Sequence, residues 1–479
     1  MAAIDLTKQV TWSPQELRTL YAGPFLNNAP LPDVGNLAPI TGVAVDSRLV
    51  KAGDLFIALA GDPGEKFKTG ARSDADGHDY LAHALERGAA AALVAQRQDV
   101  AIPQYQTAET YDGLWQLGSA ARSRLGGPVV AVTGSSGKTT AKSFLAEALQ
   151  AYAPPGSFNN HIGVPLSLAN AWQGAPAWVF EIGTSNPGEI APLTAMARPD
   201  LAILLNVQTA HIENFASRQA LVEEKSQIFS TLPKDGLRVV HDELNIDGYQ
   251  FGSAGTSHAR VRDLEGDRLS LSLLGEPIVA RVPGGGAHRA LTLSACLLAM
   301  KLLDFDLAPG LALSGESVPS GRGNSHIACG IEVVDDSYNA NPSSMQAAIA
   351  AFLSRTNTAS QSSGDGQGRC FVVLGDMREI GDQAADAHKK LLEHLAHAPA
   401  LHGIVLVGEQ INQALDRLQT TELGRSLGPR IYGQFQEANS QLLDLLLQEL
   451  RPGDRVLIKG SNRIFWASAF VEKLLGKLT

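Results

Sequence analysis

Glycines, hydroxyl-bearing residues and one lysine follow one another in the segment GSSGKTT, near the start of the second quarter of the chain. Gly134 and Gly137 would let the backbone turn tightly and direct several N–H groups at one anion. Lys138 would add a full positive charge, and the hydroxyl of Thr139 is a ligand that Mg²⁺ accepts. These types at this spacing predict a site for a phosphate group.

The elements around this segment are those that a phosphate loop requires. The apolar run PVVAVTG reads as a strand that leads into it, and a helical pattern follows. Ligands of open α/β sheets bind beyond the carboxyl ends of strands. The order of elements therefore favours ATP or GTP binding over a glycine-rich turn with a solvated lysine. The usual spacing would place glycine where this chain has Val132, so the loop is a shortened form. The residues expected to hold the nucleotide phosphates are Gly134, Ser135, Ser136, Gly137, Lys138, Thr139 and Thr140.

Two further polar groups follow neighbouring strand-like runs. Glu181 closes AWVFEIG, and His211 comes shortly after LAILLNV. Taken singly, Glu181 could be a surface acid and His211 a loop residue, but a shared sheet edge favours a magnesium site beside the phosphate loop. Lys225 falls on a predicted helix next to Glu223 and Glu224. Composition alone makes it a surface lysine without a role.

The last third of the chain offers another polar group at a strand end. Asp336 ends the run IEVVDD, and Asn339 and Asn341 form a turn before the helical pattern SMQAAIAAFL. These side chains could start the helix or could bind a polar ligand. Arg322, in PSGRGN, could pair with a phosphate or be solvated.

The pattern of strand-like and helical runs changes twice along the chain and divides it into three zones. Residues 1–105 carry short strand-like runs and a helical stretch, YLAHALERGAAAALVA. In residues 106–313 apolar strands alternate with helices, which is typical of a parallel sheet covered on both faces. Residues 314–479 repeat this alternation of apolar strands with helices. We therefore predict an α/β protein of three domains: an N-terminal α/β domain, a central parallel-sheet domain with the phosphate loop, and a C-terminal Rossmann-like domain. Glycine and proline in VPGGGAHRA and SVPSGRGNS favour a hinge near the second boundary.

Composition narrows the class of function. The net charge of −10 argues against a general nucleic-acid binder. No apolar run reaches the roughly 18 residues that span a bilayer, and the N-terminus does not read as a secretory signal, so we expect a cytoplasmic protein without membrane insertion. Cys296, Cys329 and Cys370 lack metal-type spacing, and we expect buried free thiols.

Ordered blocks in all three zones resemble one known family, the muramyl ligases of peptidoglycan synthesis. The resemblance covers almost the whole chain and is far more specific than the phosphate loop alone. Its blocks are GVAVDSRLVKAGDLFIALAG, DGHDYLAHALERGA, TGSSGKTT, FNNHIGVPLSLA, EIGTSNPGEI, NVQTAHIENFASRQALVEEKSQIF, DDSYNANPSSM, LGDMREIGD with His388, and VLIKGS.

The resemblance implies an ATP-dependent ligase that forms an amide bond through an acyl phosphate. The expected substrates are UDP-MurNAc-tripeptide and D-Ala-D-Ala, the expected cofactors are ATP and Mg²⁺, and a monomer is expected. A sister ligase that adds the third-position diamino acid is a rival, but such enzymes tend to have DYAHTP where this chain has DSYNANP, and their DNPR motif is missing here. A folate-type polyglutamate ligase is a more distant rival, because it lacks a uridine-binding first domain.

Site roles carry over to the positions that match the family's motifs. Lys138 and Thr139 would bind ATP phosphates and magnesium, and Glu181 and His211 would also ligate the metal. Lys225 matches the family's carbamylated lysine, which helps to position magnesium. Further expected nucleotide contacts are His288, Arg322 and Asp336. Expected substrate contacts are Ser47 and Arg48 for the uridine nucleotide, Asn159 and Asn160 for the muramyl substrate, and Asn339 and Asn341 for the dipeptide. Thr184 and Ser185 are also expected to bind substrate.

One block departs from the family pattern. The family has histidine and then asparagine, with a second asparagine three residues later, near the adenine. GAHRALTLSA instead gives His288, Arg289 and Thr292, so both asparagines are replaced. This departure is the best argument for a different class, a catalytically inactive nucleotide-binding homologue.

Overall fold

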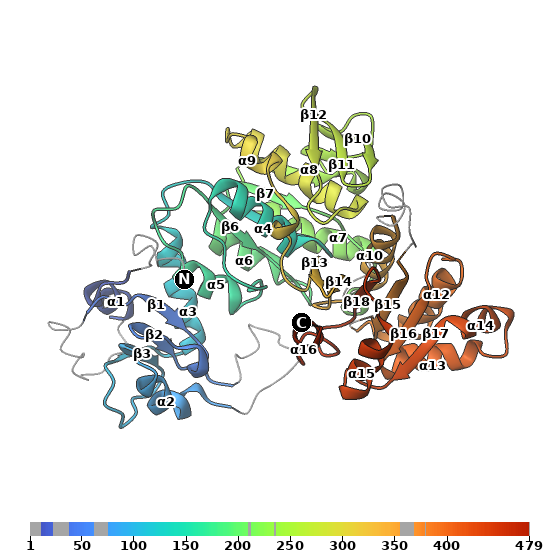
Figure 1. Cartoon of the computed structure of the whole chain (residues 1–479). Coiled ribbons are helices and arrows are strands. Elements are labelled where there is room, and N and C mark those ends of the chain that lie inside the picture. Colours follow the sequence, from blue (N-terminus) through green and yellow to red (C-terminus); the bar gives the residue numbers. More distant parts are fainter. Residues whose placement is uncertain are drawn as a thin grey trace. The chain divides into compact units, whose positions relative to one another are not determined.

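The computed structural model (Figure 1) describes residues 11–22, 38–61, 75–208, 212–233, 236–354, 368–378 and 380–478. His211, a predicted metal ligand, lies outside them. The chain divides into two compact units: Met1–Thr133, Leu149–Ile203 and Glu224–Arg238 form the first, and Gly134–Ala148, Leu204–Glu223 and Val239–Thr479 form the second. Within the described part, no helix has the length and apolar character to cross a membrane.

The first sheet has four parallel strands in the order β1-β2-β3-β4. They are β1 (Gly42–Ala44), β2 (Asp54–Ile57), β3 (Ala91–Val94) and β4 (Gln104–Gln106). Helices in this part of the chain are α1 (Pro14–Tyr21), α2 (Leu81–Glu86) and α3 (Thr110–Arg122). Side chains of α2, among them Leu81 and Ala84, pack in one buried cluster with Phe56 and Ala92 of the sheet.

One predicted helix in this region is wrong over its second half. The stretch YLAHALERGAAAALVA starts as α2, but the helix ends at Glu86 and the later residues form β3. Gly88, with φ of +95°, turns the chain out of the helix. All four residues of β3 are buried, because they lie inside a parallel sheet. A run of alanines has no helical periodicity strong enough to override that tertiary burial.

The second sheet has eight strands in the order β12-β11-β10-β9-β8-β7-β5-β6. Its strands are β5 (Val129–Thr133), β6 (Trp178–Glu181), β7 (Leu201–Leu204), β8 (Leu237–His241), β9 (Tyr249–Gly252), β10 (Ala259–Glu265), β11 (Arg268–Leu273) and β12 (Glu276–Arg281). The accompanying helices are α4 (Lys138–Leu149), α5 (Gly163–Ala169), α6 (Ile190–Ala197), α7 (Arg218–Ser226), α8 (Ala287–Leu302) and α9 (Ala308–Leu311). The three apolar runs predicted as strands are confirmed as β5, β6 and β7.

An antiparallel extension of this sheet was not predicted. Strands β10, β11 and β12 pair antiparallel through two tight turns. Gly266 takes φ of +62° in the first turn, and Leu274 and Gly275 take +49° and +92° in the second. Two-residue turns of this kind match the twist of a hairpin, and they are the sequence signal that was available.

The third sheet has six strands in the order β13-β14-β18-β15-β16-β17, all parallel except the pair β13–β14. They are β13 (Asn324–Ala328), β14 (Ile331–Asp336), β15 (Cys370–Gly375), β16 (Gly403–Val407), β17 (Ile431–Phe435) and β18 (Arg455–Lys459). The helices are α10 (Pro342–Ser354), α12 (Ala384–Ala396), α13 (Glu409–Leu418), α14 (Glu422–Leu427), α15 (Ser440–Glu449) and α16 (Phe470–Lys477). The run IEVVDD is confirmed as β14, and the predicted alternation of apolar strands with helices is confirmed by β15, β16 and β18.

Alternation along these strands builds a three-layer body, drawn in orange to red in Figure 1. Val372 and Leu374 of β15 belong to a core cluster with α10, α12 and α13. Phe371 and Val373 of the same strand belong to the opposite cluster, with α15 and α16. Helices on both faces of a mostly parallel sheet confirm the predicted α/β class. The predicted domain boundaries themselves stay a prediction.

The cysteines only partly follow expectation. All three are free thiols, and Cys296 and Cys370 are buried. Cys329 is exposed, so its predicted burial is wrong. It occupies the tip of the β13–β14 hairpin with φ of +46°, where a two-residue turn faces solvent.

Candidate active site

The phosphate loop leaves β5 and enters α4 as predicted, and its two glycines are required by the backbone. Gly134 has φ of +156° and Gly137 has φ of +82°. A Cβ on Gly137 would also lie 3.2 Å from Thr292 Oγ1, and one on Gly134 would lie 3.0 Å from Leu205 Cβ. Helix α4 begins at Lys138, so the loop lies at the N-terminal end of a helix, where anions are favoured.

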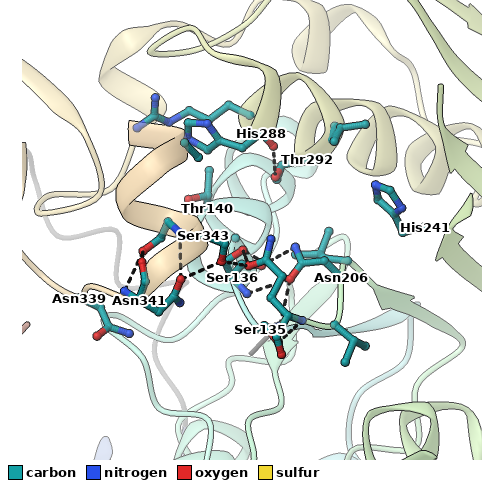
Figure 2. Close-up of a pocket in the computed structure, with 18 of the residues that line it drawn as sticks. Ser135, Ser136, Thr140, Asn206, His241, His288, Thr292, Asn339, Asn341 and Ser343 are labelled. Carbon is teal, nitrogen blue, oxygen red and sulfur yellow. Dashed lines mark hydrogen bonds between the residues drawn. The ribbon is translucent and has the colours of Figure 1, made fainter. Parts of the chain in front are cut away.

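Asn206 holds this loop in shape, as Figure 2 shows. The backbone N–H of Ser135 donates to the Asn206 carbonyl and to its Oδ1, both at 3.1 Å, and Ser136 N–H donates to the same Oδ1 at 3.0 Å. Asn206 Nδ2 donates to Ser136 O at 3.2 Å. Lys138 Nζ donates to Gly134 O at 2.7 Å, so the ammonium folds back over the loop. Asn206 was missed by the sequence analysis, because a single asparagine after a strand forms no motif.

A cavity of about 300 Å³ opens beside the loop, and all its lining residues belong to the second compact unit. It brings together most of the predicted nucleotide and dipeptide residues. Gly134, Lys138 and Thr139 are absent from the lining but adjoin it in the loop and the first turn of α4. The predicted residues that line it are Ser135, Ser136, Gly137, Thr140, His288, Arg322, Asp336, Asn339 and Asn341.

Lys459, which was not predicted as a site residue, organises one wall of the cavity. Its Nζ lies 2.9 Å from Asp336 Oδ2 and donates to Asn339 O at 2.9 Å. Asp336 and Lys459 are register partners at the carboxyl ends of β14 and β18. Lys459 is buried, and this burial lowers the pKa of its ammonium below the ordinary value, although the nearby Asp336 carboxylate opposes the effect.

The turn before α10 supports both readings that the sequence left open. Asn341 Oδ1 accepts from Ser344 N at 2.9 Å, which caps the helix, and lies 2.9 Å from Ser343 Oγ. Asn341 also lines the cavity, as does Asn339. Arg322 lines the cavity as well, with its guanidinium carbon 4.0 Å from the centre of the Tyr338 ring.

The residues that depart from the family pattern take structural roles. Arg289 Nη1 donates to Gly284 O at 3.0 Å and Gly285 O at 3.1 Å, and Nη2 donates to Arg322 O at 2.8 Å. It therefore joins the two glycine-containing segments that favour a hinge. Thr292 Oγ1 donates to His288 O at 3.0 Å.

His288 is a neutral imidazole at pH 7. Burial, with the positive charges of Arg289 and Lys459, lowers the pKa of His288 to about 3. A neutral ring offers one nitrogen as donor and the other as acceptor. It can therefore contact an uncharged ligand group in the cavity, such as a base edge, without adding charge.

A second group of predicted residues lies in the first compact unit. Glu181, at the end of β6, is fully buried, and its Oε1 accepts from Asn159 Nδ2 at 2.7 Å. A Cβ on Gly183 would lie 2.8 Å from Asn159 Cγ, so glycine lets this asparagine approach. Asn160 Oδ1 accepts from Gly163 N, the first residue of α5, at 2.9 Å. The predicted metal and muramyl-peptide residues 159 and 181 are thus in direct contact.

The loop after β6 is fixed by two acids. Thr184 Oγ1 donates to Asn186 O at 2.6 Å, and Ser185 N donates to Glu189 Oε2 at 2.7 Å. Glu224 on α7 accepts from Gly188 N at 2.7 Å. Thr184 and Ser185 therefore sit in an ordered turn that follows the strand carrying Glu181.

Lys225 contradicts its composition-based reading as a surface lysine. Only 2% of the residue is exposed, and it is among the largest fully buried side chains of the described chain. It lies near the C-terminal end of α7, in the part of that helix that belongs to the first compact unit. The neighbouring Glu223 and Glu224 suggested that Lys225 faces solvent, but Glu224 is itself buried.

The predicted uridine residues occupy a short 3₁₀ turn, Ser47–Leu49. Ser47 is buried, with its Oγ 3.0 Å from His83 Nδ1. The side chain of Arg48 is 80% exposed and forms an ion pair with Asp46 at 2.7 Å. That hydrogen-bonded pair lowers the pKa of Asp46.

The donor types of two predicted ligands fit magnesium. Thr139 offers a hydroxyl and Glu181 a carboxylate, and Mg²⁺ takes few protein oxygens and retains several waters. Among residues of the described ranges, no group of three or more His, Cys, Asp or Glu side chains is arranged to hold a metal. These residues therefore fit Mg²⁺ by the chemical type of their donor atoms, which are oxygens.

Comparison with known proteins gives the same family over both halves of the chain. The Mur ligase middle domain matches residues 132–260, and the domain described as "Mur ligase, glutamate ligase domain" matches residues 322–462. The UDP-N-acetylmuramoyl-tripeptide–D-alanyl-D-alanine ligase of Treponema pallidum is 31% identical, with 91% of this chain and 94% of that protein covered. The enzyme of the same name from Bacillus subtilis is also 31% identical, with coverage of 88% and 91%.

Solved structures agree along the length of the chain. MurF from Acinetobacter baumannii superimposes with a TM-score of 0.76 at 25% identity, covering 98% of this chain and 100% of that structure. MurF ligase from Thermotoga maritima, solved in complex with ADP, gives 0.70 at 27% identity and covers 92% and 99%. These matches confirm the predicted three-domain α/β fold class.

Proposed function

The chain belongs to the Mur ligase family, and we propose that it joins D-alanyl-D-alanine to UDP-N-acetylmuramoyl-tripeptide while ATP is cleaved to ADP and phosphate. The observation that carries the proposal is the cavity of the second unit, where the phosphate loop faces the turn that holds Asn339 and Asn341. A site with a nucleotide end and an acceptor end suits a reaction that first activates one substrate and then adds another.

Amide formation requires a better leaving group than oxide. In the proposed reaction the γ-phosphoryl of ATP moves to the terminal carboxylate of the tripeptide, and the dipeptide amine then attacks the acyl carbon and expels phosphate. Negative charge builds on the transferring phosphoryl group. Lys138 and the N-terminal end of α4 stabilise that charge most in the transition state, which accelerates the step.

We assign the magnesium ligands by family resemblance to Thr139, Glu181, His211 and carbamylated Lys225. Bound magnesium would neutralise charge on the nucleotide phosphates. The burial of Lys225 supports a role inside a site rather than at the surface. A carbamate also presents oxygens, the ligand type that Mg²⁺ prefers.

Substrate roles follow the matched blocks. Residues 1–105 would hold the uridine nucleotide through Ser47 and Arg48, residues 106–313 would bind ATP, and residues 314–479 would receive the dipeptide. We place the muramyl peptide against Asn159, Asn160, Thr184 and Ser185, and the nucleotide against His288, Arg322 and Asp336. We further propose that the chain acts as a monomer in the cytoplasm.

Two rival functions make different predictions. A diamino-acid ligase would accept a single amino acid, but the similar proteins over most of the chain are named for dipeptide addition. An inactive nucleotide-binding homologue is favoured only by Arg289 and Thr292, which replace the family's asparagines. It would bind ATP without forming any amide.

The test is a product assay on the purified chain. With ATP, Mg²⁺ and UDP-MurNAc-tripeptide, we expect phosphate release and a new amide when D-Ala-D-Ala is added. When the UDP-MurNAc precursor that carries only a dipeptide is supplied with diaminopimelate or lysine, we expect neither phosphate release nor an amide. Lys138→Ala serves as the inactive control. Amide formation with a diamino acid alone, or none at all, would contradict the proposal.

A further inference from the structure

The side chain of Gln208 connects the phosphate loop with the turn that precedes α10. Gln208 Oε1 accepts a hydrogen bond from Ser136 Oγ at 3.1 Å and another from Ser343 Oγ at 2.6 Å. The backbone N–H of Gln208 also donates to Ser135 Oγ at 2.9 Å. These four residues lie in the second compact unit, and Gln208 lines the cavity.

The partners of Gln208 lie at two different ends of the cavity. Ser135 and Ser136 form the phosphate loop, whereas Ser343 lies in the first turn of α10. Ser343 Oγ is also 2.9 Å from Asn341 Oδ1, the group that caps the helix. Figure 2 shows Ser136, Ser343 and Asn341 joined by a continuous series of hydrogen bonds.

We propose that Gln208 is a positioning residue that couples the nucleotide end of the cavity to its acceptor end. This inference rests on the proposed function and deepens it. While the acyl phosphate exists, the Gln208 bridge holds the Asn339–Asn341 turn against the phosphate loop, so that the dipeptide amine reaches the acyl carbon before water does.

The chemistry of the amide suits this role. One carbonyl oxygen has two lone pairs, so it accepts both hydroxyls at once without adding charge beside the phosphates. A carboxylate at this position would accept the same hydroxyls but would repel the nucleotide. A methyl group would remove the bridge and leave the rest of both segments in place.

Loss of the bridge has a defined chemical consequence. In the coupled reaction the amine nitrogen bonds to the acyl carbon, the carbon–oxygen bond to phosphate breaks, and one amide forms for each ADP. If water attacks the acyl carbon instead, the carboxylate and phosphate are regenerated, and the net reaction is hydrolysis of ATP. The ratio of ADP to amide therefore measures the coupling directly.

The experiment uses the full-length chain with UDP-MurNAc-tripeptide, D-Ala-D-Ala, ATP and Mg²⁺. ADP and amide are quantified in the same reaction for wild type, Gln208→Ala, Ser343→Ala and the double variant. We expect a ratio close to one in the wild type. In each single variant the ADP formed in excess of amide, divided by the amide, should rise on the order of two- to tenfold, as for loss of one hydrogen bond. The double variant should exceed neither single by much, because both remove one interaction.

Gln413→Ala is the matched control. Gln413 is exposed on α13, and its side chain donates to Glu409 of the same helix. A ratio of one in Gln208→Ala, with an unchanged melting curve, would overturn the coupling. If that variant does not fold, Ser343→Ala decides alone by the same criterion. A wild type that forms no amide contradicts the proposed function together with the coupling, whereas amide formation with unchanged ratios contradicts the coupling alone.

Discussion

Two lysines illustrate how burial changes the chemistry of one residue type. Lys459 is buried beside the Asp336 carboxylate, which favours its charged form against the effect of burial. Lys225 is equally buried, and carbamylation would give it an anionic group whose oxygens suit magnesium. One lysine thus serves as a fixed counterion, and the other is proposed to become a metal ligand.

The proposed role of Lys225 predicts a specific rescue. Lys225→Ala should lower turnover by roughly a hundredfold or more, because an oxygen ligand near the transferring phosphoryl is lost. Added formate or acetate should restore part of it by supplying an oxygen anion to the space. Lys389→Ala, at an exposed helical position, is the control. Full activity in Lys225→Ala would remove this residue from the site.

His288 predicts a pH dependence of stability. Its pKa is about 3 in the folded chain against an ordinary 6.5, so between these values the unfolded chain binds a proton that the folded chain does not. The free energy of unfolding therefore falls as pH drops from 6.5 towards 3, by up to about 1.4 kcal/mol per pH unit from this group. His288→Gln should flatten the dependence of apparent Tm on pH in that window, and exposed His397→Gln should not. Parallel curves for His288→Gln and wild type would refute the assignment.

At the scale of elements, the pairing of β14 with β18 places Asp336 opposite Lys459. Removing one member of a buried ion pair leaves an uncompensated charge, which costs about 3 kcal/mol or more. Lys459→Met should therefore lower the apparent Tm by roughly 6–12 °C. Thermal unfolding followed by circular dichroism measures this.

The chain offers a matched control for that pair. Lys390 and Asp386 are 2.7 Å apart on α12, but both side chains are more than 60% exposed. Lys390→Met should shift Tm by a degree or two at most. If Lys459→Met shifts Tm no more than Lys390→Met, the buried pair contributes nothing to this edge of the sheet.

The elements also show what sequence patterns can predict. Buried parallel strands such as β5, β6, β15 and β18 were predictable because they are continuous apolar runs that end at polar residues. Strand β3 was not, since its alanines also suit a helix and only the surrounding sheet decides. Cavity residues with a motif were found, whereas Asn206, Gln208 and Lys459 were missed, because folding alone brings these isolated polar residues together.

For the whole molecule, we propose that each of the three sheets belongs to a part of the chain that binds one of the three substrates. Family membership and the α/β class follow from ordered blocks along the chain, and relatives covering about nine-tenths of it support the dipeptide-adding function. The proposed magnesium ligands come from segments far apart in sequence. Their spacing carries no local signal, so resemblance rather than periodicity identified them.

In the proposed reaction a carboxylate is phosphorylated before the amine arrives, and the transfer of an oxygen isotope can detect this step. UDP-MurNAc-tripeptide labelled with ¹⁸O in its terminal carboxylate is incubated with the chain, ATP, Mg²⁺ and D-Ala-D-Ala, and the released phosphate is analysed by mass spectrometry. An acyl phosphate leaves with one carboxylate oxygen, so the account predicts one ¹⁸O in each phosphate that accompanies an amide. Unlabelled phosphate formed together with amide product would contradict it.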